Sequence, residues 1–100
     1  MDPGIPEFLI ADVVRSTAGR DKGKLFYVVS VDGTYLTLVN GRDRTLEKPK
    51  RKKWKHTEKV LRPQTRVAEK LRSGDKVLNS ELRRDLAYLS REVQSSNLGG

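Results

Sequence analysis

The chain has 100 residues, of which 21 are Lys or Arg and 13 are Asp or Glu, so its net charge is +8 and its pI is near 10.1. This length predicts one domain with a modest core, and the charge favours a polyanionic partner, either nucleic acid or an acidic membrane surface. The lack of cysteine excludes disulfides, thiolate metal sites and cysteine nucleophiles. No apolar run is long enough to span a bilayer or to act as a signal sequence, so we expect a cytoplasmic protein with no membrane partner.

Residues 1–8 do not have the pattern of a folded segment. They contain two prolines and a glycine, which break both helices and strands. The last two, Glu7 and Phe8, are what an EcoRI cloning site encodes when it is read in frame. We interpret residues 1–8 as an expression leader, with a native flexible arm as the alternative.

A charged loop at 18–24, which we call the Gly19 loop, follows between predicted strands at 13–17 and 25–31. Both runs are rich in Val and aromatic or aliphatic residues, and the loop has a glycine near each end. Gly19 and Gly23 can adopt positive φ, so the chain can turn tightly and direct the loop cations outward. These cations are either solvated charges or contacts to a phosphate backbone. They are Arg20, Lys22 and Lys24.

Residues 24–40 predict a β-hairpin. Asp32-Gly33 suits a two-residue type I′ turn, in which both central residues have positive φ. Apolar residues then occupy both faces of the hairpin, which indicates a bent barrel packed at one end by a helix. The register pairs Val29 with Leu36 and Tyr27 with Leu38, and it places Phe26 and Val39 on the opposite face.

Two further short strands are predicted, at 45–47 and 57–61, after a turn at Asn40-Gly41. The segment between them, 48–55, has the strongest compositional signal in the chain, because it carries six cations and no acid. A solvated face usually alternates charge signs, so this run favours phosphate contact, which would be strong and salt-dependent. Its cations are Lys48, Lys50, Arg51, Lys52, Lys53 and Lys55.

Four residues in or near this segment also have candidate roles. Trp54 either stacks on an unpaired base or covers one end of the barrel, and a lone tryptophan in a small domain favours the second role. His56 is the only histidine, so paired-histidine sites are excluded. It either fills a polar position at a strand start, which is the favoured role, or donates to a phosphate. Arg42 and Arg44 would extend a basic face if the fold brings their turn beside the Gly19 loop.

Residues 62–93 predict a helical extension. Pro63 suits the first turn of a helix with one face formed by Val67, Ala68 and Leu71, and Gly74 suits its end. Asn79 or Ser80 would cap a second helix, whose apolar stripe either docks on the barrel or first helix or forms an interface with another chain. The stripe comprises Leu82, Leu86, Leu89 and Val93. Residues 94–100 predict a disordered tail.

Two of these segments together resemble a known family. The run from Asp12 to Val29, with its charged loop between two strands, resembles a KOW motif, which occurs in many ribosomal proteins and transcription elongation factors. The basic run from Leu46 to His56 narrows the resemblance to the branch that contains ribosomal protein L14e and its small bacterial relatives. This family usually has a glycine just before the first strand, where the chain has Ala11. The resemblance implies an SH3-like barrel whose KOW loop contacts ribosomal RNA.

An enzymatic function is not expected. Gly19 to Leu25 superficially resembles a phosphate-binding P-loop, but the spacing is one residue short and Leu25 stands where a hydroxyl must reach magnesium. No nucleophile and base pair and no metal-ligand cluster is evident, so we expect no cofactor.

The sequence therefore predicts a mainly β fold: a small SH3-like KOW barrel of about five strands over 9–61 with a short helical C-terminal extension. The expected function is non-catalytic binding of structured, ribosomal RNA through the loop and the basic segment, by a ribosome-associated protein that is monomeric when free. Ribosomal or other translation proteins are further expected partners. The alternatives are a KOW-type protein-interaction module that uses the 82–93 stripe, and binding of duplex DNA or acidic lipid through charge alone.

Overall fold

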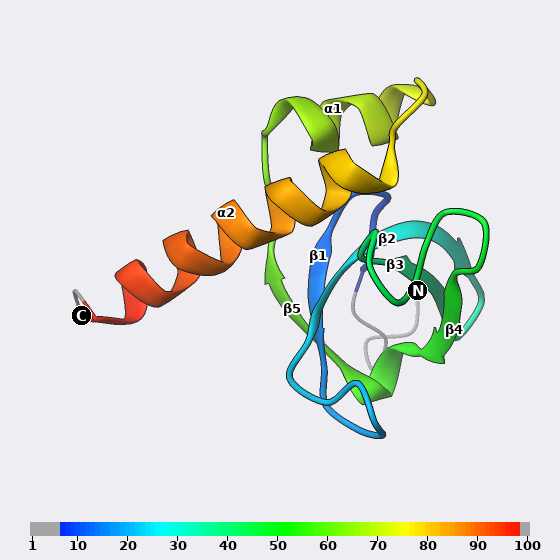
Figure 1. Ribbon diagram of the computed structural model, residues 1–100. Helices are drawn as coiled ribbons and strands as arrows, with labels where there is room; N and C mark the ends of the chain where they lie inside the picture. Colours follow the sequence, from blue (N-terminus) through cyan, green and yellow to red (C-terminus); the bar gives the residue numbers. More distant parts are fainter. Residues whose placement is uncertain (1–6, 99–100) are drawn as a thin grey trace.

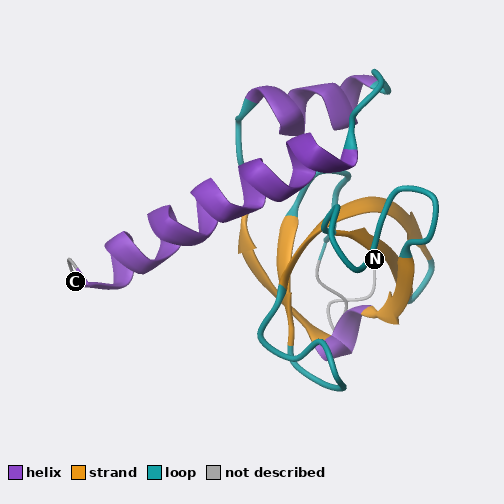
Figure 2. Ribbon diagram, viewed as in Figure 1, coloured by secondary structure: helices purple, strands orange, loops and turns teal. Residues whose placement is uncertain are grey.

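The computed structural model describes residues 7–98 and consists of one antiparallel sheet and two α-helices (Figures 1 and 2). The elements are β1 (Val13–Ser16), β2 (Leu25–Asp32), β3 (Tyr35–Val39), β4 (Lys50–Lys53), the 3-10 turn η1 (Trp54–His56), β5 (Thr57–Leu61), α1 (Arg66–Ser73) and α2 (Asn79–Leu98). The strand order is β4-β3-β2-β1-β5, and the sheet curls without closing because β4 and β5 do not pair. The predicted mainly β fold with five strands is confirmed.

The sheet is apolar on both faces, as the hairpin sequence predicted. Its concave side encloses one cluster, against which Phe8 and Trp54 pack: Val14, Phe26, Val28, Leu36 and Leu38. The opposite side packs against α1 and α2 at one end of the sheet (Figure 1). The buried residues of this second cluster include Val13, Tyr27, Val39, Val67, Ala68, Leu82, Leu86 and Leu89. The predicted docking of the helical stripe on the body of the protein is therefore confirmed for Leu82, Leu86 and Leu89, whereas the half-buried Val93 is not part of this cluster.

The hairpin register differs from the prediction. The turn is formed by Gly33 and Thr34, and Asp32 pairs with Tyr35. Only Gly33 has positive φ, at 60°, which fits a type II′ turn and spares Asp32 the left-handed conformation that type I′ requires. A bulge at Val29 shifts the register once more. The predicted pairs of Val29 with Leu36 and Tyr27 with Leu38 were wrong: Val31 faces Leu36, and Tyr27 faces Val39 on the same side of the sheet.

The basic segment is itself a strand, not the predicted linker. β4 pairs with β3, so that Lys50 lies opposite Leu38 and Lys52 opposite Leu36. The predicted strand at 45–47 is absent, because the backbone N–H of Leu46 donates to the side chain of Asn79 in α2 at 2.9 Å. The predicted strand at 57–61 is confirmed as β5.

Both helices begin at positions other than those predicted. Thr65 caps α1, since its hydroxyl accepts the N–H of Ala68 at 3.2 Å, and Pro63 precedes the helix. At the start of α2 the carboxylate of Glu81 accepts the N–H of Leu78 at 2.9 Å, so neither Asn79 nor Ser80 is the cap. Gly74 ends α1 in the left-handed conformation, as predicted.

The predicted terminal segments also differ from the structure. α2 is helical through Leu98, where a disordered tail over 94–100 was predicted; residues 79–98 contain no glycine or proline that would end the helix earlier. Phe8, the last residue of the predicted leader, packs against the concave cluster. Residues 1–6 of the leader and 99–100 lie outside the described residues.

A polar network joins the sheet to both helices. The hydroxyl of Tyr27 in β2 donates to Asp85 in α2, and the hydroxyl of Thr65, the α1 cap, donates to the same carboxylate at 2.7 Å. Burial and the neighbouring Asp85 carboxylate both raise the pKa of Tyr27. This network fixes the helices on the face of the sheet that carries Tyr27.

Candidate nucleic-acid interface

Lys52 lies inside the protein, although the sequence predicted it to contact RNA. Only 9% of its surface is exposed. Its ammonium donates to Asp21 Oδ1 at 2.9 Å, to Ser16 Oγ at 2.9 Å and to the carbonyl oxygen of Ala18 at 2.8 Å. All three ammonium hydrogens thus have protein acceptors. The prediction that Lys52 contacts a phosphate is corrected, because its charge is used to fasten the Gly19 loop to β4.

Asp21 is the partner that makes this burial possible. Burial opposes ionisation of its carboxylate, but hydrogen bonds from Lys52 and Ser16 outweigh that effect and lower the pKa of Asp21 below its ordinary value. The second carboxylate oxygen has no hydrogen-bond partner among the described residues. An ion pair of this kind is strongly destabilising to break, since either partner alone is a buried, uncompensated charge.

The turn that carries Arg42 and Arg44 lies beside the Gly19 loop, an adjacency that the sequence left open. Lys24 in the loop and Asp43 in the turn form an ion pair of 2.9 Å. Asn40 donates to the same carboxylate at 2.7 Å, and these two hydrogen bonds lower the pKa of Asp43 to about 2. Lys24 therefore shares its charge with a carboxylate and holds the loop and the turn together.

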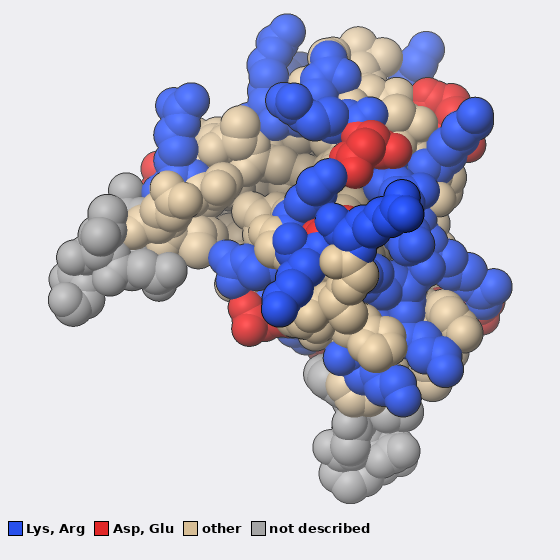
Figure 3. Space-filling model, turned by 60° about the horizontal axis from the view of Figure 1, so that its bottom comes forward, with Lys and Arg blue, Asp and Glu red and all other residues tan. Residues whose placement is uncertain are grey.

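A hollow of about 280 Å³ opens between the loop, the turn and β4. We call it the basic hollow; the cations that line it are Arg20, Lys24, Arg44, Lys50 and the buried Lys52. Its two carboxylates, Asp21 and Asp43, already pair with lysines. In the described part of the chain, no carboxylate lies within ion-pair distance of Arg20, Arg44 or Lys50. Figure 3 shows a face of the molecule on which Lys and Arg side chains crowd together around few acids.

The remaining cations of β4 leave the strand on its other side. Arg51 and Lys53 lie over the ring of Tyr35, 4.5 and 5.8 Å from its centre, and Arg51 also pairs with Asp32 at 3.2 Å. Since β4 is an edge strand, these charges also discourage association with another sheet edge. The basic segment is therefore divided between two sides of one strand. The other predicted contacts are exposed: Lys22, Arg42, Lys48 and Lys55.

Trp54 and His56 have structural positions at the end of β4. The half-buried Trp54 ring packs against the concave cluster, which agrees with the covering role that the sequence favoured. The backbone N–H of Trp54 donates to Thr34 at 2.9 Å. His56 is the exposed last residue of η1, directly before β5, and its carbonyl accepts the N–H of Thr17 at 2.9 Å.

Ser16, Asp21 and Asp43 are the site residues that sequence reasoning missed. Each acid stands between cations in a loop or turn, which is a weak signal of local charge pairing. The partner of Asp21, however, is 31 residues away in the chain. No local pattern marks such a pairing.

The comparison with known proteins does not assign this chain to a family. No protein-family model matches the chain, and no curated protein matches its sequence.

Within residues 7–98, no three His, Asp or Glu side chains are grouped so that they could hold a metal ion. Neither described helix has the length and apolar character of a membrane span.

Proposed function

We propose that this protein is a non-catalytic RNA-binding module, an SH3-like KOW barrel that holds the phosphates of structured RNA at the basic hollow. The observation that carries the proposal is the convergence of Arg20, Arg44 and Lys50. These cations come from a loop, a turn and a strand, and the nearby carboxylates do not neutralise them. A phosphate backbone would do so, with release of its condensed counterions.

The backbone before β1 supports the KOW assignment. Ala11 has a φ of 72°, which places a non-glycine residue in the left-handed region. This is the position where the resembled family usually has glycine, the residue that adopts such a conformation without steric cost. The strand order, with short edge strands on either side of a central β-meander, is compatible with the same assignment.

Recognition would depend mainly on the shape of the RNA. The deep major groove of A-form RNA hides its base edges, so side chains contact phosphates and 2′-hydroxyls. The resemblance to relatives of ribosomal protein L14e makes ribosomal RNA the proposed ligand and the ribosome the proposed location.

No specific observation favours the alternative of a protein-interaction module. Its proposed contact surface was the 82–93 stripe, but Leu82, Leu86 and Leu89 of this stripe are buried against the protein's own sheet and first helix.

The proposal is tested by comparing a structured RNA hairpin with duplex DNA of the same length and sequence at matched salt. Tighter binding to RNA, together with salt-sensitive co-sedimentation with ribosomes, is the expected result. Equal affinity for the two nucleic acids would mean that charge alone accounts for the binding, and it would contradict RNA recognition.

A further inference from the structure

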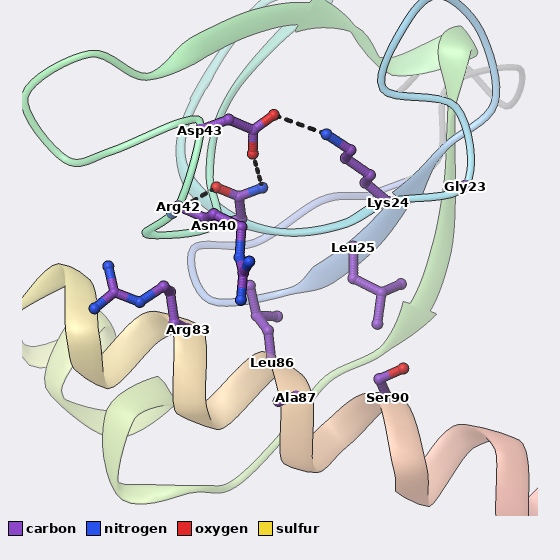
Figure 4. Close-up of a pocket in the computed structure, with 10 residues that line it drawn as sticks. All are labelled: Gly23, Lys24, Leu25, Asn40, Arg42, Asp43, Arg83, Leu86, Ala87 and Ser90. Atoms are coloured by element: carbon purple, nitrogen blue, oxygen red, sulfur yellow. Dashed lines mark hydrogen bonds and ion pairs between the residues drawn. The ribbon is translucent and has the colours of Figure 1, made fainter.

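A second hollow, of about 370 Å³, lies between α2 and the strands (Figure 4). We call it the helix groove. Leu25 from β2 and Leu86 and Ala87 from α2 form an apolar surface in it. Lys24 and Asp43 line both the helix groove and the basic hollow, so the two sites are contiguous across this ion pair.

Two arginines flank one end of the helix groove, while Leu25 and Ser90 lie at the other end (Figure 4). Arg42 is exposed and has no carboxylate within ion-pair distance among the described residues. Arg83 donates one N–H to the carbonyl oxygen of Gly41 at 2.8 Å, which holds its guanidinium in place and leaves other donors free. The groove therefore combines anchored positive charge with an apolar surface.

This combination of positive charge and apolar surface fits some parts of an RNA molecule better than others. A phosphate alone gains nothing from Leu25, Leu86 and Ala87, and a base inside a helix cannot reach them. An unpaired nucleotide offers both an anionic phosphate and a base whose flat face can pack on apolar groups, and proteins hold such extruded bases against apolar side chains. The volume lies within the range of about 300–1,000 Å³ that is usual for small-ligand sites.

We infer that the helix groove binds one unpaired nucleotide of the RNA, with its base against Leu25, Leu86 and Ala87 and its phosphate at Arg42 and Arg83. The inference rests on the proposed function, because the basic hollow would hold the phosphates that flank this nucleotide. The ligand class is thus a helix with a bulged or looped-out base.

The test compares two RNA hairpins that differ only in a single bulged uridine, each titrated with the intact chain in a fluorescence anisotropy assay. The wild type should bind the bulged hairpin about tenfold more tightly, because the apolar side chains of the groove remove one face of the extra base from water. Ala87→Glu places a carboxylate in the groove and should abolish this ratio. Tyr88→Glu makes the same charge change on an exposed neighbour that does not line the groove, and it should keep the ratio.

Each other outcome has a defined meaning. Equal binding of both hairpins by the wild type would overturn the inference but leave the basic hollow intact as an RNA site. If both variants lose the preference for the bulged hairpin, or if both variants keep it, the inference is also overturned. If the wild type binds neither hairpin, the proposed function fails, and the inference fails with it.

Discussion

At the scale of single residues, neighbouring cations of one basic run have different roles. Lys50 and Lys52 point to the same side of β4 and both line the basic hollow, yet Lys50 has no carboxylate within ion-pair distance among the described residues, whereas Lys52 is buried and donates to Asp21, Ser16 and Ala18. Composition alone cannot separate them. The difference arises because the Gly19 loop folds over the position of Lys52.

Lys52→Met should lower the free energy of unfolding by about 3 kcal/mol, because it leaves Asp21 buried without its counter-charge. Lys50→Met is the matched control, and it should change stability by no more than about 0.5 kcal/mol. Urea denaturation of the two variants measures the difference. Similar destabilisation by both substitutions would show that Lys52 is not the buried anchor of the loop.

The same ion pair predicts a response to acid. Folding lowers the pKa of Asp21 below its ordinary value of 3.8, so the carboxylate stabilises the fold above that value. This stabilisation is lost as the pH falls through the lower, folded-state pKa. When unfolding is measured from pH 6 downward, the free energy of unfolding should begin to fall about one pH unit above 3.8. The Asp21→Asn variant should show a smaller fall over the same range. An identical acid profile in the variant would contradict the assignment.

At the scale of elements, the turn at 40–44 is positioned by α2. Gly41 is buried with a φ of 76°, and a Cβ atom at this residue would lie 2.2 Å from the carbonyl oxygen of Asn79. The side chain of Asn79 in turn accepts the N–H of Leu46. The first turn of α2 thus fixes the turn that presents Arg42 and Arg44.

Gly41→Ala should therefore destabilise the protein more than Gly33→Ala. Gly33 also has positive φ, but a Cβ atom there meets nothing within 4 Å, so only the conformational cost of about 1 kcal/mol applies. Gly41→Ala adds a steric clash with backbone, which costs about 2 kcal/mol more. Thermal or urea unfolding compares the two variants. Equal losses would mean that the turn does not pack against α2 as described.

The sequence predicts elements well where a local period exists, and poorly where a distant group decides. The hairpin, β5 and the apolar stripe of α2 follow from alternation or helical spacing, and all three are present. β4 was missed because a run of cations has no apolar alternation. The predicted strand at 45–47 failed because Asn79, 33 residues from Leu46, takes its backbone N–H.

At the scale of the whole molecule, the net charge of +8 is less informative than its arrangement. Lys24, Lys52, Arg62 and Lys70 pair with acids inside the protein's own framework. The basic hollow also contains three cations that have no such partner among the described residues, Arg20, Arg44 and Lys50. This separation into structural and free cations predicts that only some substitutions alter RNA binding.

The most direct test is the affinity for an RNA hairpin over a salt series, measured for the wild type and for a variant with Arg20, Arg44 and Lys50 replaced by alanine. Loss of three phosphate contacts should reduce the magnitude of the slope of log K against log salt by about 2–3. A control variant removes three exposed cations outside the hollow, Arg66, Lys76 and Arg84, and should nearly retain the wild-type slope. The same slope in the hollow variant and the wild type, or the same reduction in both variants, would contradict the basic hollow as the RNA-binding site.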